Sequence, residues 1–357
     1  MCKFDVNITQ GSHICKSLFK LHLQRMSWHP FCLKRRGKSV RIRAMRVLAL
    51  ISTLSTLFFL ANCQQTYAGN YNKRYSSSSG IHGQSTTRGY RTNNYAASSN
   101  PLVPVRPLAQ PTTPAPKPIC AAVCVIDPRT GRILYGHNEN ERRQVASTQK
   151  IITALCVCDA GNLDKPVTIK REDKVNTQPI RLAQANVGEV YTRRSLLQAM
   201  LTGSYNDIAY ALARDVAGSE AAFAKLMNAR ARRMKMYNSH FANPHGLPAA
   251  QYSTARDMAI AACHAYMNPT IREFVDIPTV NFTLASGKSR NMNNTNKLLQ
   301  KYSWVNGMKT GYTNAAGRCL ISSGSLNGRA VIVVVLGCPK PKIWAESEKY
   351  LRWAMGV

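Results

Sequence analysis

Acidic residues are scarce in the first third of this 357-residue chain. Residues 1–118 hold 17 of the 48 lysines and arginines but a single acid, Asp5, whereas residues 119–357 hold the other 31 basic residues and 16 acids. Both parts are therefore basic. The sequence has no basic segment interleaved with aromatic residues and no recognition-helix pattern, so we predict no nucleic-acid partner. An anionic cell envelope explains the positive charge equally well.

Long apolar runs are also missing, because the run over residues 47–61 is short for a membrane-spanning helix. It follows Met45 and a cluster of basic residues, and it precedes the small-residue segment 66–68. This order predicts a cleaved export signal over residues 45–68. We therefore expect an exported protein, located in the periplasm or at the outer face of the cytoplasmic membrane.

Residues 1–44 are too many to precede an export signal of ordinary length, so we interpret them as an over-extended N-terminus, with Met26 or Met45 as the initiator. Residues 60–63 resemble a lipoprotein cleavage box, except that Asn62 stands where a small residue is normal. Lipidation of Cys63 would anchor the protein to a membrane without spanning it. An N-terminal membrane or lipid anchor therefore stays open.

The composition changes again after the signal. Residues 69–100 are rich in Ser, Thr, Tyr, Asn and Arg and lack apolar periodicity, and residues 101–118 carry seven prolines. This pattern predicts a linker over residues 69–118, flexible at first and then stiffer and polyproline-like. Residues 119–357 are long and apolar enough to form one globular domain.

Seven of the eleven cysteines lie in the globular part, and several sit inside apolar runs. We expect them to be buried free thiols that act as small hydrophobes, although export would permit a disulfide. Residues 156–158, Cys-Val-Cys, lack zinc-finger spacing, so we predict no metal and no cofactor. We interpret His245 as a loop residue that supports the fold and not as a metal ligand, and His240 gives no stronger signal.

Strands are expected at both ends of the globular part and helices between them. This order predicts an α/β (α+β) fold, with one sheet built from both ends and an inserted helical region. The predicted strands cover residues 121–126, 132–135, 304–313, 319–323 and 330–336, and the predicted helices cover 144–158, 194–201, 207–216, 221–236 and 342–355.

Three short polar motifs occur in a fixed order: Ser147 to Lys150 (STQK), Ser204 to Asn206 (SYN) and Lys309 to Gly311 (KTG). Each motif alone is a weak signal, because residues 17–20 also fit the SxxK pattern by chance. Together they supply a nucleophile, a nearby lysine, a second hydroxyl with an amide, and a cationic strand. These are the parts of a serine acyl-transfer site that works without histidine, so we predict an enzyme.

The spacing of the first motif is chemically apt. Ser147 and Lys150 are i and i+3 on one predicted helix, so the amine can reach the hydroxyl. Lys150 must be neutral to act as a base, and burial together with the charge of Lys309 would lower its pKa. Ser147 near the start of the helix also places backbone N–H groups where an oxyanion develops. We expect Gly311 to let a substrate backbone lie against its strand.

The second motif has two interpretations. Ser204 and Asn206 can provide a hydroxyl relay and an amide that holds the substrate or Lys150. Ser and Asn immediately before a helix are also common helix caps. The joint occurrence with the other two motifs favours the site.

Seven segments, in order, resemble the serine D-alanyl-D-alanine carboxypeptidases, the low-molecular-mass penicillin-binding proteins of peptidase family S11. The resemblance runs from about residue 119 to the C-terminus. It implies a β-lactamase/transpeptidase-like fold, in which a five-stranded antiparallel sheet is flanked by helices and an all-helical subdomain is inserted. Beyond the three motifs, the matching segments are 241–248 (FANPHGLP), 253–259 (STARDMA), 294–299 (NTNKLL) and 305–317.

The resemblance implies a role for each catalytic residue. Ser147 is expected to be the acylated nucleophile, Lys150 its base, and Ser204 the proton relay to the leaving group. The implied reaction removes the terminal D-alanine of peptidoglycan stem peptides through an acyl-enzyme. β-Lactam antibiotics are then expected to trap the same serine, and residues 119–357 to be the catalytic domain.

The same resemblance implies a set of substrate-binding residues. Asn206 would position the substrate, Lys309 and Thr310 would receive its terminal carboxylate next to Gly311, and the backbone N–H of Tyr312 would be the second oxyanion donor.

Two departures from the family pattern leave the substrate preference open. Tyr205 replaces the usual glycine in the middle of SxN, and residues 178–185 lack a Gly-Ser-Ser-rich loop. A D,D-endopeptidase acting on peptidoglycan cross-links is therefore the main alternative. A β-lactamase is disfavoured because no ExxLN-like segment follows Ser204. A non-catalytic penicillin-binding sensor is disfavoured by the intact set of motifs.

Overall fold

The computed structural model describes residues 107–173 and 187–357. The predicted N-terminal extension, export signal, Cys63 and first part of the linker lie outside these residues, as does the segment 178–185. None of the helices within the described part of the chain has the length and apolar character of a membrane span.

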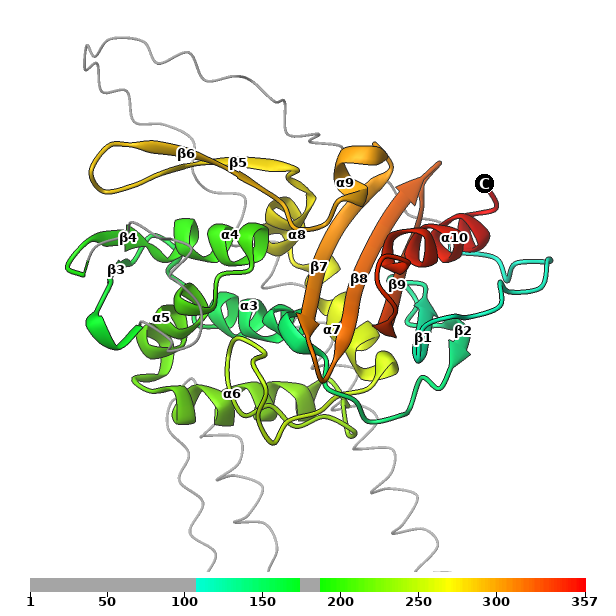
Figure 1. The fold of residues 1–357 in the computed structure, drawn as a ribbon, viewed down its shortest axis with the longest axis horizontal. Coiled ribbons are helices and arrows are strands. Elements are labelled where there is room, and N and C mark those ends of the chain that lie inside the picture. Colours follow the sequence, from blue (N-terminus) through cyan, green and yellow to red (C-terminus); the bar gives the residue numbers. More distant parts are fainter. Residues whose placement is uncertain (1–106, 174–186) are drawn as a thin grey trace, which may run out of the picture. The chain divides into compact units, whose positions relative to one another are not determined.

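A five-stranded antiparallel sheet forms the centre of the domain (Figure 1). Its order is β2-β1-β9-β8-β7, so the first and the last strands of the domain are neighbours. This confirms the predicted sheet built from both ends of the globular part. The strands are β1 (Ala122–Ile126), β2 (Ile133–His137), β7 (Val305–Thr313), β8 (Gly317–Leu326) and β9 (Arg329–Cys338).

The sheet is buried on both faces, which explains why β1 and β9 read as continuous apolar runs. Along β9, Val333 belongs to the core under the C-terminal helix α10 (Ile343–Met355), whereas Ile332 and Val334 belong to the core shared with the other helices. Successive side chains therefore pack into cores on opposite faces of the sheet, as the pleat of a strand requires.

On the face of the sheet opposite α10, α7 (Ala255–Met267) packs against β1 and β9, α8 (Pro269–Asp276) packs against β7, and the helices before them in the chain pack on one another. The predicted helices near 194–201, 207–216 and 221–236 are confirmed with longer or slightly shifted bounds. They are α4 (Arg193–Gly203), α5 (Asn206–Ala217) and α6 (Glu220–Arg233).

The helix predicted over residues 144–158 is wrong at its start. Residues Ala146–Gln149 form a 3-10 turn, η1, and the α-helix α3 begins only at Lys150 and ends at Asp159. The chain enters η1 with Ala146 in the left-handed region, at φ 48°. An α-helix cannot extend through such a residue, so Ser147 lies in the turn before the helix.

Several elements were not predicted from the sequence. Helix α7 had a readable start signal, because Thr254 caps it by accepting from the backbone N–H of Asp257. The unpredicted elements are α7 (Ala255–Met267), α8 (Pro269–Asp276), α9 (Leu298–Lys301), η2 (Arg171–Asp173), the pair β3 (Pro166–Thr168) and β4 (Val190–Thr192), and the hairpin β5 (Thr279–Thr283) and β6 (Ser289–Asn293).

The stretch 107–119 runs along the domain and makes hydrogen bonds to it. The Tyr350 hydroxyl donates to the Pro116 carbonyl at 2.8 Å, and the backbone N–H of Ile119 donates to the Glu346 carboxylate at 2.9 Å. Residues 107–118 of our predicted linker thus contact α10 and the β1–β2 hairpin. The domain boundaries themselves stay predictions.

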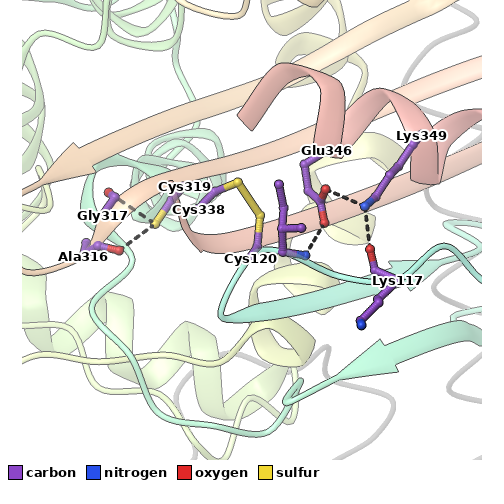
Figure 2. Close-up of a disulfide and its surroundings, with 9 residues drawn as sticks. Lys117, Cys120, Ala316, Gly317, Cys319, Cys338, Glu346 and Lys349 are labelled. Atoms are coloured by element: carbon purple, nitrogen blue, oxygen red, sulfur yellow. Dashed lines mark hydrogen bonds and ion pairs between the residues drawn. A yellow bond between two sulfur atoms is a disulfide. The ribbon is translucent and has the colours of Figure 1, made fainter. Parts of the chain in front are cut away.

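A disulfide joins Cys120, just before β1, to Cys338, the last residue of β9 (Figure 2). Our expectation of free thiols is therefore wrong for these two cysteines. They are 218 residues apart in sequence, and only the pairing of β1 with β9 brings them together. The other five cysteines of the described residues are free: Cys124, Cys156 and Cys319 are buried, and Cys158 and Cys263 are half-buried.

We expect reduction of this disulfide to destabilise the domain. A crosslink over so long a segment removes much freedom from the unfolded chain, which predicts a loss of about 2–5 kcal/mol in the free energy of unfolding. The measurement is denaturant unfolding of the wild-type chain and of the Cys120→Ser/Cys338→Ser variant, with Cys158→Ser as the matched free-thiol control. Equal unfolding midpoints for all three proteins would contradict the prediction.

Candidate active site

The fold brings the three predicted motifs together. Ser147 lies in η1, Lys150 opens α3, Asn206 opens α5, and the KTG motif lies on β7 at the edge of the sheet (Figure 1). β7 packs directly against η1, and α5 packs against α3. Residues from four separate elements thus converge on one place.

The amine of Lys150 is the centre of this cluster. Its Nζ lies 2.9 Å from Ser147 Oγ, 2.7 Å from Asn206 Oδ1 and 2.6 Å from the carbonyl oxygen of His245. The Lys150 side chain is fully buried. The predicted contact between Ser147 and Lys150 is therefore present, although it spans a 3-10 turn and the first residue of α3.

Burial lowers the pKa of Lys150 well below its usual value, and the positive charge of Lys309 lowers it further. The carboxylate of Asp207 acts in the opposite direction and raises this pKa. Desolvation is the largest of these effects, so the environment favours the neutral amine that a general base requires.

Lys309 and Thr310 lie on β7, and a residue of the connection between β6 and α9 contacts Thr310. Lys309 is fully buried, burial lowers its pKa to about 7, and its Nζ donates to the Thr310 carbonyl at 3.1 Å. The Thr310 hydroxyl donates to Thr295 Oγ1 at 2.7 Å. Thr295 belongs to the segment 294–299, whose likeness to the family was noted, but the sequence assigned it no role.

Gly311 meets a packing need that the sequence did not reveal. A Cβ atom there would lie 2.9 Å from the backbone nitrogen of Ser147 and 3.0 Å from that of Thr148. Backbone atoms cannot give way cheaply, so the glycine allows β7 to pack against the turn that carries Ser147. Our expectation that Gly311 also admits a substrate backbone stays a prediction.

Ser204 ends a helix and does not begin one. It adopts a left-handed conformation, at φ 63°, and its backbone N–H closes α4 on the Met200 carbonyl at 3.0 Å. The N-cap of α5 is Tyr205, so the interpretation of Ser204 and Asn206 as N-terminal caps is wrong. Within the described residues no hydrogen bond joins the Ser204 hydroxyl to Ser147 or Lys150, and its relay role stays a prediction.

Two aromatic residues, Tyr205 and Tyr312, lie within or next to the motifs. A Cβ atom at Gly203 would lie 2.2 Å from the Tyr205 ring, so Gly203 makes room for it. The Tyr312 side chain is 58% exposed, donates to Asn314 Oδ1 at 2.9 Å, and lies under the Arg318 guanidinium. The predicted oxyanion role of the Tyr312 backbone is not tested by these contacts.

The loop 243–247 was missed as part of the site, although residues 241–248 stood out in the sequence. The His245 carbonyl accepts from Ser147 Oγ at 3.2 Å as well as from Lys150. Thr153 donates to the Pro244 carbonyl at 2.7 Å, which ties the loop to α3. A Cβ atom at residue 246 would lie 2.2 Å from the Ala146 carbonyl oxygen, so a glycine is needed where the loop packs against η1.

Over residues 107–173 and 187–357, no three His, Cys, Asp or Glu side chains gather in a way that could hold a metal ion. The absence of a metal and of a cofactor stays a prediction.

The site combines a serine, a buried lysine whose pKa favours the neutral form, and a cationic strand, at the junction of an antiparallel sheet and a helical region. These features define the class of serine acyl-transfer enzymes that use lysine in place of histidine. A family model described as D-alanyl-D-alanine carboxypeptidase, Peptidase_S11, matches residues 110–340. The chain belongs to this family.

The chain is similar to proteins named D-alanyl-D-alanine carboxypeptidase and D-alanyl-D-alanine endopeptidase. The D-alanyl-D-alanine carboxypeptidase DacF of Bacillus subtilis is 36% identical over 225 residues, which cover 61% of this chain and 57% of DacF. A D-alanyl-D-alanine endopeptidase of Pseudomonas aeruginosa is 32% identical over 239 residues, which cover 64% of this chain and 75% of the relative. The chain therefore spans little more than half of one relative and three quarters of the other.

Solved structures show the same fold. The D-alanyl-D-alanine carboxypeptidase of Mycobacterium tuberculosis H37Rv matches with a TM-score of 0.65 and 28% identity, over 70% of this chain and 96% of that one. The Streptomyces K15 DD-transpeptidase matches with a TM-score of 0.63 and 29% identity, over 69% of this chain and all of that one. The expected transpeptidase-like fold is confirmed.

Proposed function

We propose that this protein is a serine-type D-alanyl-D-alanine carboxypeptidase that removes the terminal D-alanine of peptidoglycan stem peptides through an acyl-enzyme on Ser147. The observation that supports this proposal most strongly is the contact of 2.9 Å between Ser147 Oγ and the buried Lys150 amine. Family membership supports the substrate class.

Acylation begins when the neutral Lys150 amine takes the proton of Ser147. The serine oxygen attacks the carbonyl carbon of the D-Ala-D-Ala peptide bond, and backbone N–H groups of Ser147 and Tyr312 stabilise the oxyanion. The C–N bond then breaks, and the leaving amine receives the proton from Lys150 through the Ser204 hydroxyl. Free D-alanine leaves, and an ester links Ser147 to the shortened peptide.

Substrate binding falls to the KTG strand and Asn206. Lys309 and Thr310 receive the free carboxylate of the terminal D-alanine, and the Asn206 amide positions the peptide. Deacylation reverses the first step: Lys150 takes a proton from water, the hydroxide attacks the ester carbonyl, and the proton returns to Ser147. β-Lactams acylate Ser147 in the same manner and stay attached.

The substrate lies in the cell wall, so the proposal requires export. The candidate signal over residues 45–68 supplies it and places the enzyme in the periplasm or at the outer face of the cytoplasmic membrane. An N-terminal membrane or lipid anchor, with Cys63 as the lipid site, is compatible with this location.

Two relatives named D-alanyl-D-alanine endopeptidase, at 32% and 28% identity, support the second candidate, cleavage of peptidoglycan cross-links by the same site. We expect the purified chain to release D-alanine from a linear stem pentapeptide at least about tenfold faster than it cleaves cross-linked dimers, a difference of about 1.4 kcal/mol between the barriers. The measurement is free D-alanine against separated monomers by chromatography. Faster cleavage of the dimers would establish the endopeptidase instead.

A further inference from the structure

The side chain of His245 has a polar neighbour at each end of its ring. The imidazole is 7% exposed, and its Nδ1 accepts from the backbone N–H of Leu247 at 3.2 Å. Its Nε2 lies 3.2 Å from Oε1 of Glu220, the first residue of α6. Because Nδ1 is an acceptor, the proton of the neutral ring must sit on Nε2, where it faces the Glu220 carboxylate.

The Glu220 contact is not explained by the rest of its surroundings. Its Oε1 is buried and has no partner with hydrogen-bond geometry among the described residues, and its ion-pair contact within that part of the chain is with the imidazole alone. An acid in the first turn of a helix interacts favourably with the helix dipole, and this purely structural role is the alternative explanation. The two explanations differ in what they predict for the His245 carbonyl. A purely structural role of Glu220 would leave its position unchanged on loss of the acid, whereas a role in the site would not.

A neutral lysine amine has two N–H donors and one lone pair. At Lys150 two acceptors surround Nζ, the His245 carbonyl at 2.6 Å and Asn206 Oδ1 at 2.7 Å. When each takes one N–H, the lone pair is left to accept from the hydroxyl of Ser147, 2.9 Å away, once that hydroxyl turns its proton from the His245 carbonyl to the amine. The direction in which the base points therefore depends on where the His245 carbonyl is held.

We propose that Glu220 and His245 form a positioning pair for the acylation site: they fix the carbonyl that turns the lone pair of Lys150 toward Ser147. This inference rests on the proposed function. Glu220 touches no reacting atom and acts from α6, which contributes no other residue to the site described above.

The pair also makes the site sensitive to acid. Protonation of His245 at Nδ1 would remove the acceptor for the Leu247 N–H and add a cation near Lys150. Burial lowers the pKa of His245, Glu220 raises it, and Lys150 lowers it. Lys309 and Asp207 are the other charged groups that act on Lys150. Loss of the Glu220 charge should therefore lower the pKa of His245, so that the enzyme stays active to lower pH.

The test compares Glu220→Ala and Glu220→Gln in the full chain with Glu273→Ala, an exposed acid on α8. We expect Glu220→Ala to lower kcat by roughly tenfold to a hundredfold with KM nearly unchanged, because a misplaced catalytic group costs about that much. Glu220→Gln keeps an acceptor for Nε2 and should retain most of the rate, while the acid limb of its pH profile moves to lower pH.

Equal kcat for Glu220→Ala and Glu273→Ala would overturn the proposal. If Glu220→Ala does not fold, as judged by thermal melting, the Glu220→Gln profile decides: an unshifted acid limb overturns the proposal, and a shift to lower pH supports it. A wild-type chain that neither releases D-alanine nor reacts with a fluorescent penicillin overturns the proposed function as well, whereas an active wild type with unaffected variants overturns the positioning pair alone.

Discussion

Replacement of Ser147 by alanine is expected to abolish covalent labelling by a fluorescent penicillin and to lower D-alanine release by at least about 10⁴-fold, the scale on which loss of a nucleophile acts. The physical reason is that no other hydroxyl of the described residues lies within hydrogen-bond distance of the buried Lys150 amine. The variant retains every other group of the site. Labelling intensity on a gel and chromatographic release of D-alanine are the two measurements.

The matched control is Ser286→Ala, which removes an exposed hydroxyl from the turn between β5 and β6. It should label and turn over like the wild type. Undiminished release of D-alanine by Ser147→Ala would refute the assignment of the nucleophile.

Replacement of Lys150 by methionine should leave the nucleophile in place but remove its base. We expect the acylation rate to fall by roughly 10²–10⁴-fold, the usual contribution of a positioned general base. The wild-type rate should rise with pH through the lowered pKa of Lys150, because burial and Lys309 disfavour the charged amine. The variant should lose this rise and keep only the fall at low pH that protonation of His245 predicts.

Stopped-flow acylation by a chromogenic β-lactam over a range of pH checks both expectations. Lys288→Met, which removes an exposed lysine in the β5–β6 hairpin region, is the control and should behave like the wild type. A variant at Lys150 that keeps the wild-type pH profile would show that another group is the base.

The parts of the fold that depend on local pattern could be predicted from the sequence. The apolar runs of β1 and β9, with strands at both ends of the domain and helices between them, indicated the sheet, and the ordered motifs indicated that Ser147, Lys150 and Asn206 meet. These inferences held because apolar runs and residue chemistry are both visible along the chain.

The parts that depend on contacts distant in sequence could not be predicted. The 3-10 turn at Ser147 packs closely against the backbone at Gly246 and Gly311, which are distant from it in sequence. The disulfide of Cys120 with Cys338 follows from strand order. His245 contributes its backbone carbonyl to the site, and a backbone carbonyl cannot be recognised from the residue type.

The most direct test of the account is to find where a β-lactam attaches. The full chain is incubated with benzylpenicillin, digested, and the adduct located by mass spectrometry. We predict a single penicilloyl adduct, on the peptide that contains Ser147 and at its hydroxyl. An adduct on Ser204 or any other side chain, with Ser147 unmodified, would contradict the account.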